Sequence, residues 1–156
     1  MKDFVNVGLL GAGTVGGGVL KVLEKNAEKI TKEVGKPVRI TKVLDRHVDR
    51  LKQEYGDKYI FTDNADEVLE DKEIDIIVEL LGREHPAKEF IARAFANGKH
   101  VVTANKDVLA KFGSELFPLA HEHNCDFMFE ASVCGGIPII GPLKTSMAAN
   151  QITSIM

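Results

Sequence analysis

A glycine-rich hexapeptide near the start of the chain has the residue spacing of a phosphate-binding turn. Residues 11–16 read GAGTVG and match the pattern G-x-G-x-x-G. In this pattern the first glycine permits a tight turn, the second lets the backbone approach a pyrophosphate, and the third lets a helix pack closely on a strand. The following helix would offer free N–H groups and a partial positive charge to the phosphates. The residues expected to bind a dinucleotide here are Gly11, Ala12, Gly13, Thr14, Val15 and Gly16.

A charged pair, Asp45-Arg46, follows the second predicted strand and bears on the choice of cofactor. A carboxylate at this place binds the ribose 2′-hydroxyl of NAD, whereas an arginine accommodates the 2′-phosphate of NADP. Asp45 would repel that phosphate and Arg46 would attract it. The pair lies further from the glycines than the usual ~20 residues, because the intervening helix and loop are long. We expect both residues to contact the cofactor, with a slight preference for NAD and with NADP left open. The alternative is a solvated charge pair with little effect.

Short apolar runs alternate with helical stretches along the whole chain and would position these residues. The segments that predict strands are residues 4–10, 38–44, 59–62, 74–81, 100–103 and 127–132. The near-continuous hydrophobicity of 74–81, whose only charges are Asp75 and Glu79, is typical of parallel strands covered on both faces. The order of elements predicts an α/β fold, a doubly wound (Rossmann-type), mostly parallel sheet with helices on both faces. Ligands of such sheets bind beyond the carboxyl ends of the strands, where the strand order switches.

Local signals set the expected limits of several helices. Apolar residues recur at helical spacing over 15–30, which predicts one continuous helix face. Asp63 is the expected N-cap of a helix over 65–70. Gly113 and Pro118 are expected to interrupt the helix over 108–123. Residues 152–156 have the composition of a further strand.

Composition limits the classes of function. The length of 156 residues fits one domain, and 44% hydrophobic with 28% charged residues is ordinary for a globular protein. Lys and Arg number 20 against 23 Asp and Glu, so we expect no nucleic-acid partner. Apolar runs fall short of the roughly 18 residues of a membrane span, and we expect neither a membrane partner nor a signal peptide. Two cysteines, Cys125 and Cys134, fit a reducing cytoplasm.

Three further motifs carry a specific resemblance. They are ELLG at 79–82, VTANK at 102–106 and EASVCGGIPII at 130–140. Together with the glycine turn, they resemble the nucleotide-binding part of homoserine dehydrogenases. That family interconverts L-homoserine and L-aspartate 4-semialdehyde with NAD or NADP, in threonine and methionine biosynthesis. The resemblance implies a small-molecule substrate and a homo-oligomeric full-length protein.

The family continues into a substrate and dimerisation domain that holds its main catalytic lysine. By this resemblance, residues 1–150 form the dinucleotide-binding domain and 151–156 begin the next one. We therefore expect a chain that binds cofactor and lacks turnover alone. Two alternatives are another NAD(P)-dependent reductase, of the semialdehyde or dihydrodipicolinate type, and a nucleotide-sensing module without catalysis.

The resemblance also implies roles for single residues near the nicotinamide. Lys106 would be a supporting catalytic group, acting by charge and position, and would contact the cofactor. Gly82 and Thr103 would lie beside the same half of the cofactor. Asn105 would hold the turn before Lys106, or serve only as a loop residue.

Glu130 falls in the last predicted strand, where a buried carboxylate is costly unless it is paired. The resemblance implies a sodium ion as its partner. The ligands would be the Glu130 carboxylate and the backbone carbonyls of Val133, Gly135 and Ile137, because hard cations prefer oxygen. The alternative is a glutamate at a strand end that points into the cleft.

Overall fold

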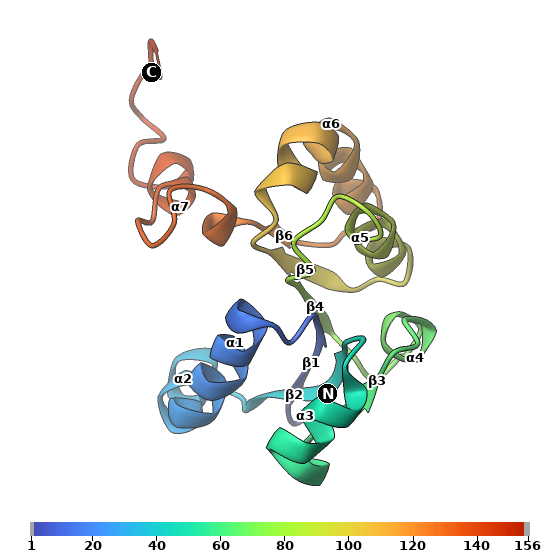
Figure 1. The fold of residues 1–156 in the computed structure, drawn as a ribbon. Coiled ribbons are helices and arrows are strands. Elements are labelled where there is room, and N and C mark those ends of the chain that lie inside the picture. The colour runs from blue at the N-terminus through green and yellow to red at the C-terminus, as the bar shows by residue number, and fades with distance from the viewer. Residues whose placement is uncertain (1, 155–156) are drawn as a thin grey trace.

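The apolar runs form the strands of one sheet. The computed structural model describes residues 2–154, and within them the sheet has six strands (Figure 1). The strands are β1 (Val5–Leu10), β2 (Val38–Leu44), β3 (Ile60–Thr62), β4 (Ile76–Glu79), β5 (His100–Thr103) and β6 (Phe127–Met128). Each neighbouring pair is parallel, and the order is β3-β2-β1-β4-β5-β6. This confirms the doubly wound α/β fold.

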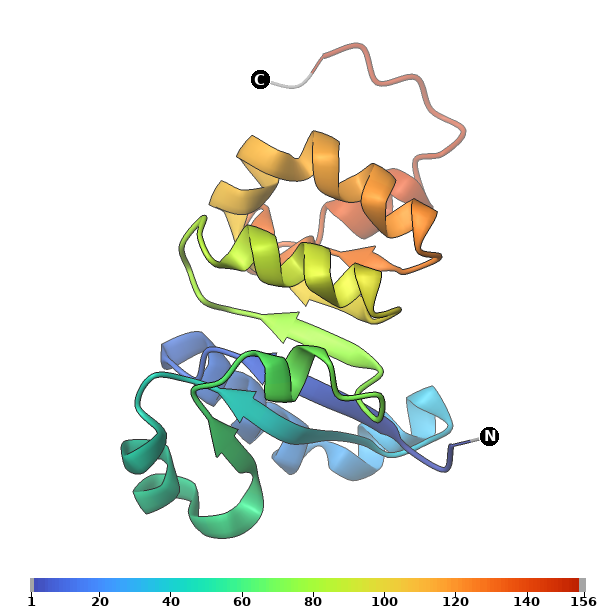
Figure 2. The same ribbon diagram turned by 90° about the vertical axis from the view of Figure 1, so that its right-hand side faces the viewer.

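Helices cover the sheet from two sides, as Figures 1 and 2 show. They are α1 (Thr14–Lys25), α2 (Ala27–Val34), α3 (Val48–Tyr55), α4 (Asp66–Leu69), α5 (Ala87–Ala96), α6 (Lys106–Glu122) and α7 (Ile140–Lys144). Two short 3₁₀ helices, η1 (Gly56–Lys58) and η2 (Glu130–Ser132), lie in connections. After α7 the chain runs away from the sheet (Figure 2).

Alternate residues of the central strands β1 and β4 enter two separate cores. Val7 and Leu9 of β1 face Leu20 of α1 and Leu51 of α3. Leu10 belongs to the other core, which α4, α5 and α6 build with β4, β5 and β6. Burial on both faces explains why β1 and β4 are mostly apolar, whereas on the outer strands β5 and β6 Val102 and Met128 are 37% and 55% exposed.

β1 lies between β2 and β4. The strands β2 and β3 extend the sheet on one side of β1, and β4, β5 and β6 extend it on the other side. The connection after β1 leads to one side of the sheet and the connection after β4 to the other. Such a switch point opens a crevice at the carboxyl edge of the strands. The glycine turn at residues 11–16 directly follows β1 and therefore lies at this crevice.

Four expected element limits are wrong. The last strand ends at Met128, and Glu130 lies in η2. The first helical stretch is divided at Asn26 into α1 and α2, so its apolar positions do not share one face. α6 is continuous through Gly113 and Pro118. Residues 151–154 are not a strand, and 155–156 lie outside the described residues.

The expected N-cap of α4, Asp63, is also wrong. The helix begins at Asp66, and Asn64 Oδ1 accepts a hydrogen bond from the N–H of Asp66 at 3.0 Å. Asn64 is itself fixed by its N–H, which donates to Thr62 Oγ1 at 3.0 Å. Asn64, and not Asp63, therefore accepts the hydrogen bond at the start of α4, where the residue before the helix is Ala65. Among the residues described, no helix is both long and apolar enough to cross a membrane.

Candidate functional site

The turn after β1 requires glycine at two positions. Gly11 has a φ of 93°, and a Cβ placed on it would lie 2.8 Å from the carbonyl oxygen of Leu80. A Cβ on Gly16 would overlap the carbonyl oxygen of Gly11, because α1 starts directly against the turn. The turn after β1 and the segment after β4 are therefore in close contact at the switch point.

Gly13 differs from these two glycines, because its missing side chain leaves open space. Its φ of −71° suits other residues too, and an added Cβ would meet no described atom within 4 Å. Gly13 is the N-cap of α1, and within residues 2–154 no side chain caps this helix. The first N–H groups of α1 thus lie at an open position with positive polarity, the arrangement that binds phosphate.

The carboxylate of Asp45 lies against the glycine turn. Its Oδ2 accepts a hydrogen bond from the N–H of Ala12 at 2.8 Å, and its Oδ1 accepts one from the N–H of His47 at 2.9 Å. Both oxygens keep acceptor capacity, because a carboxylate offers about four acceptor positions. Arg50, which sequence reasoning missed, donates to the carbonyl oxygen of Ala12 at 3.5 Å.

A polar hollow of about 600 Å³ opens beside Asp45, at the carboxyl ends of β2 and β3. Its lining residues are Arg46, His47, Val48, Asp49, Arg50, Lys52, Phe61, Thr62, Asp63 and Glu67. Arg46, Arg50 and Lys52 bring positive charge to the hollow, while three carboxylates line it as well. Arg46 is exposed, so its guanidinium is available to a ligand. The hollow therefore adds a polar, charged space of about 600 Å³ next to the open turn at Gly13.

The connections after β4 and β5 form the other side of the crevice. Gly82 follows β4 with a φ of 72°, which glycine adopts without strain. Lys106 is the first residue of α6, with its side chain 78% exposed and its Nζ 3.8 Å from Asp107 Oδ2. A lysine at the positive end of a helix is electrostatically unfavourable, so this position is unusual for a purely structural residue.

Asn105 and Thr103 hold this side of the crevice from within. Asn105 caps α6, because its Oδ1 accepts a hydrogen bond from the N–H of Val108 at 3.2 Å. The Thr103 side chain is buried, and its Oγ1 donates to Glu79 Oε2 at 2.6 Å. The whole residue is 1% exposed, and its carbonyl oxygen accepts a hydrogen bond from Ser132 Oγ at 3.0 Å, so Thr103 supports this side of the crevice from beneath its surface. Sequence reasoning gave Glu79 no role, although it is one of two charges in an apolar run.

Glu130 is half-buried and lies in η2, and its carboxylate is bonded to backbone N–H groups further along the chain. Its Oε1 accepts hydrogen bonds from the N–H groups of Ile139 and Ile140, and its Oε2 accepts one from Gly141 at 2.8 Å. These bonds, led by that from Gly141, lower the pKa of Glu130. The carboxylate thereby anchors the start of α7.

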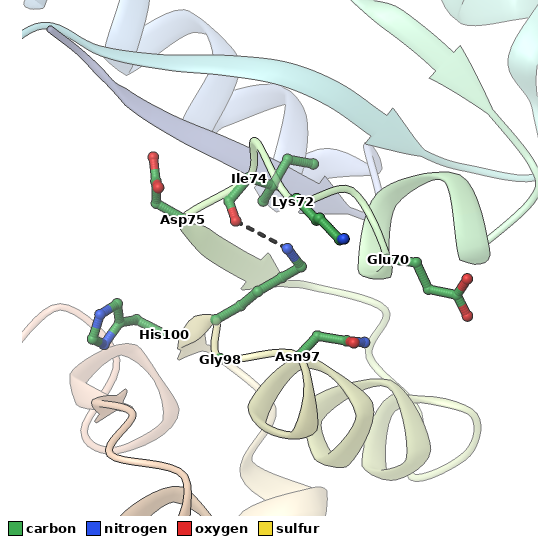
Figure 3. Close-up of a pocket in the computed structure, with 8 residues that line it drawn as sticks. Glu70, Lys72, Ile74, Asp75, Asn97, Gly98 and His100 are labelled. Atoms are coloured by element: carbon green, nitrogen blue, oxygen red, sulfur yellow. Dashed lines mark hydrogen bonds between the residues drawn. The ribbon is translucent and has the colours of Figure 1, made fainter. Parts of the chain in front are cut away.

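A second hollow, of about 330 Å³, lies at the opposite, amino edge of the sheet (Figure 3). Asp75 precedes β4 and His100 begins β5, so this hollow is remote from the glycine turn. The buried Lys99 crosses it and donates to the carbonyl oxygens of Asp71 and Ile74 (the latter at 3.0 Å). Asp75 bonds Lys2 and the N–H of Asn6, and Glu70 bonds Arg93, so these carboxylates already have partners outside the hollow. The carboxyl edge remains the candidate site.

Comparisons of sequence point to one family. A family model described as the NAD-binding domain of homoserine dehydrogenase matches residues 11–130. The homoserine dehydrogenase of Neisseria gonorrhoeae is 46% identical over 151 residues, covering 97% of this chain and 34% of the relative. That of Bacillus subtilis is 41% identical over 152 residues, covering 97% and 35%. The chain spans about a third of the length of the curated relatives it matches.

Solved structures agree with these sequence matches. A homoserine dehydrogenase from Thiobacillus denitrificans superimposes with a TM-score of 0.90 at 48% identity, covering 96% of this chain and 34% of that one. A hyperthermophilic archaeal homoserine dehydrogenase in complex with NADPH gives 0.74 at 27% identity, covering 90% and 48%.

Proposed function

The chain belongs to the homoserine dehydrogenase family and corresponds to its NAD(P)-binding domain, and on that premise we propose that it holds the cofactor of a homoserine dehydrogenase. The whole protein would transfer a hydride reversibly between L-homoserine and L-aspartate 4-semialdehyde, in threonine and methionine biosynthesis. In this proposal residues 1–150 are the dinucleotide-binding domain. About two-thirds of the relatives' length lies outside the matched region, and in this proposal that part would supply the substrate site and the main catalytic lysine.

The observation that carries the proposal is the open position at Gly13. The uncapped start of α1 and the absence of described atoms within 4 Å of an added Cβ leave room for a pyrophosphate. An alanine there would fill this space without straining the backbone, because φ is −71°.

Calorimetric titration of the chain with NAD⁺ and NADP⁺ tests the proposal. We expect saturable binding of at least one of them, and a loss of at least tenfold in affinity in Gly13→Ala. Gly18→Ala is the matched control, because a Cβ at Gly18 also meets open space but lies further along α1. Absence of binding to the parent chain, or equal losses in both variants, would contradict the proposal.

Ala12, Thr14 and Val15 complete the pyrophosphate site with the three glycines in this proposal. Asp45 would accept hydrogen bonds from the adenosine ribose through its remaining lone pairs, while holding the N–H of Ala12. Arg46 would attract a 2′-phosphate from the edge of the neighbouring hollow. The archaeal relative solved with NADPH supports NADP, and the family model described as NAD-binding supports NAD, so the proposed site accepts either cofactor.

Gly82 and Lys106 would border the nicotinamide half, with Thr103 beside them. Bound NAD(P)⁺ supplies the hydride acceptor for the alcohol carbon of homoserine. Lys106, whose Nζ is exposed at the crevice, would attract the substrate's carboxylate or its reacting oxygen and hold it in position. Asn105 would keep Lys106 in place by capping α6.

We also propose that Na⁺ binds at Glu130 with the carbonyls of Val133, Gly135 and Ile137. Cys134 and Gly135 have φ values of 56° and 57°, which turns this loop tightly. The three N–H donors on Glu130 leave one of its roughly four acceptor positions for a cation. A higher melting temperature in NaCl than in choline chloride, lost in Glu130→Gln, would support this site. Equal melting temperatures would oppose it.

The full-length protein is proposed to be a homo-oligomer in the cytoplasm. Val102 and Met128 lie on the face of β5 and β6 that points away from α5 and α6, and they are 37% and 55% exposed. An apolar sheet face of this kind suits coverage by further protein. Cys125 and Cys134 are free thiols, as fits a reducing compartment.

A further inference from the structure

We propose that Glu79 is a positioning residue for the nicotinamide half of the cofactor, an inference that rests on the proposed function. Glu79 is the last residue of β4 and has no solvent-exposed surface. It lies at the carboxyl edge of the sheet, between the glycine turn and the start of α6. The proposal is that its carboxylate fixes the two connections that border the nicotinamide.

Each oxygen of Glu79 is engaged by a different connection. Oε1 accepts the N–H of Leu81 at 2.7 Å, within the segment that leads to Gly82. Oε2 accepts the hydroxyl of Thr103 at 2.6 Å, at the end of β5. The side-chain amide of Asn105 also approaches Oε1, at 3.4 Å. The carboxylate thus joins the connection after β4 to the connection after β5.

The network continues into both connections. Thr103 Oγ1 donates to Glu79 and accepts the N–H of Asn105 at 3.0 Å, so its hydroxyl proton has a fixed direction. Asn105 Nδ2 donates to the carbonyl oxygen of Arg83 at 2.9 Å, just after Gly82. Asn105 Oδ1 meanwhile caps α6. A displacement of Glu79 would therefore move both Gly82 and the helix start that carries Lys106.

A carboxylate suits this place better than other side chains do. The groups around it are donors, and a carboxylate is an acceptor only. A glutamine would direct its NH₂ group toward either the Leu81 N–H or the Thr103 hydroxyl, and would leave at least one donor without an acceptor. A buried polar group that loses its partner is unfavourable, so the surrounding donors favour a side chain with two acceptor oxygens at this position.

Glu79 is separate from the groups that bind the adenosine half. Asp45 contacts Ala12 and His47, and the hollow at Arg46 lies at the ends of β2 and β3. β1 lies between these strands and β4. Loss of Glu79 should accordingly affect one half of the dinucleotide and spare the other.

Titration with whole and half ligands tests this separation. The probes are NAD⁺ or NADP⁺, whichever binds the parent chain more tightly, and the corresponding adenosine fragment, ADP or 2′,5′-ADP. We expect Glu79→Ala to weaken dinucleotide binding by at least tenfold and fragment binding by less than twofold. Glu79→Gln should fall between Glu79→Ala and the parent chain. The emission of bound NAD(P)H should also move toward that of the free cofactor in Glu79→Ala.

Thr103→Val tests the same network with an isosteric change, in case Glu79→Ala fails to fold. It removes the hydroxyl that joins Glu79 to Asn105 and should also weaken only the dinucleotide. Asn6→Ala is the control for general loss of a buried polar group, because Asn6 is 5% exposed and bonds Glu73 at the amino edge. It should change neither affinity.

Equal losses of dinucleotide and fragment, or no loss in either Glu79→Ala or Thr103→Val, would overturn the inference. A parent chain that binds the fragment but not the dinucleotide would overturn it as well. A parent chain that binds neither would contradict the proposed function itself, and the inference would fall with it.

Discussion

Gly16 and Gly18 are two positions apart in α1, yet only Gly16 lies where a side chain would not fit. A Cβ on Gly16 would overlap the Gly11 carbonyl, whereas a Cβ on Gly18 would meet no described atom within 4 Å. Gly16 is required by packing between helix and turn. Gly18 only lowers helix stability, because glycine loses more backbone entropy than alanine on folding.

Alanine substitution at these two glycines should change stability in opposite directions. Gly16→Ala should lower the free energy of unfolding by about 3 kcal/mol, because backbone atoms must shift. Gly18→Ala should raise it by about 0.5–1 kcal/mol. Urea unfolding followed by circular dichroism measures both. A neutral Gly16→Ala would show that the turn after β1 is not held as described.

Arg46 should affect only the cofactor that carries a 2′-phosphate. Its side chain is exposed at the hollow beside Asp45. We expect Arg46→Ala to weaken NADP⁺ by about tenfold, the size of one charge-assisted contact of about 1.5 kcal/mol, and to leave NAD⁺ unchanged. Calorimetry with both cofactors measures this difference. A parallel change for NAD⁺ would point to a structural role of Arg46.

At the scale of elements, α6 shows how packing overrides a local signal. Pro118 lies inside this helix, where it has no N–H to give to the carbonyl of Ser114. The helix nevertheless continues, because Val108, Leu116 and Ala120 are buried on its inner face. Pro118 itself is exposed, so packing against the sheet does not require a proline at this position.

Replacing Pro118 should therefore stabilise the protein. Pro118→Ala restores one backbone hydrogen bond, and we expect an increase of about 1 kcal/mol in the free energy of unfolding, after the greater entropy of the unfolded chain is subtracted. Ser114→Ala, at an exposed site of the same helix, should change it by no more than about 0.5 kcal/mol. A lower stability of Pro118→Ala in urea unfolding would mean that α6 needs the proline.

At the scale of the whole molecule, the carboxyl edge of the sheet carries the candidate site, whereas the amino edge is held together by charged contacts. The carboxyl edge carries the open turn, the exposed Lys106 and the Glu79 network. At the amino edge three lysines hold the segment before β4. Lys2 bonds Asp75 at 2.9 Å, Lys42 pairs with Asp71 at 2.8 Å, and the buried Lys99 donates to backbone carbonyls of the same segment.

Acid should weaken the amino edge through Asp75. Burial raises the pKa of Asp75, but hydrogen bonds from the Asn6 N–H and the Lys2 ammonium outweigh it, and the pKa lies below its usual value. A lowered pKa in the folded state stabilises the fold above the unfolded value, about 3.9, and this stability is lost as pH falls through the folded pKa.

Asp75→Asn should accordingly be less stable than the parent at pH 7, by about 1 kcal/mol, and the difference should shrink below about pH 4. Unfolding by urea from pH 7 to pH 3 measures the trend. The control is Glu73→Gln, whose side chain is 71% exposed. A difference that stays constant with pH would exclude this role for the Asp75 charge.

Cofactor binding should stabilise the whole molecule, because only the folded turn can hold a dinucleotide. At a cofactor concentration of 100 times Kd the gain is about 2.7 kcal/mol, which corresponds to a rise in Tm of about 5–10 °C for a domain of this size. Differential scanning fluorimetry measures it. Gly13→Ala, with an affinity at least tenfold lower, should show about half of this rise or less at the same concentration, and a rise equal to that of the parent would oppose the pyrophosphate site at Gly13.

The amino-acid sequence by itself determined the parallel α/β fold, the position of the glycine turn and the family. These depend on local patterns: an apolar run such as 74–81 predicts a strand that is covered on both faces, and Gly11, Gly13 and Gly16 lie within one short turn and the start of the next helix. The glycine turn predicted a dinucleotide cofactor, and the resemblance at 79–82, 102–106 and 130–140 identified the family.

The tertiary structure alone decided which distant groups meet. Glu79 and Thr103 are 24 positions apart, and Ala12 and Asp45 are 33 apart, and only the strand order brings each pair within a hydrogen bond. The same applies to Glu130, whose partners at 139–141 depend on how the chain turns after β6. Periodicity tells which face of an element is apolar, but it carries no information on which element lies beside it, because that depends on packing of the whole sheet.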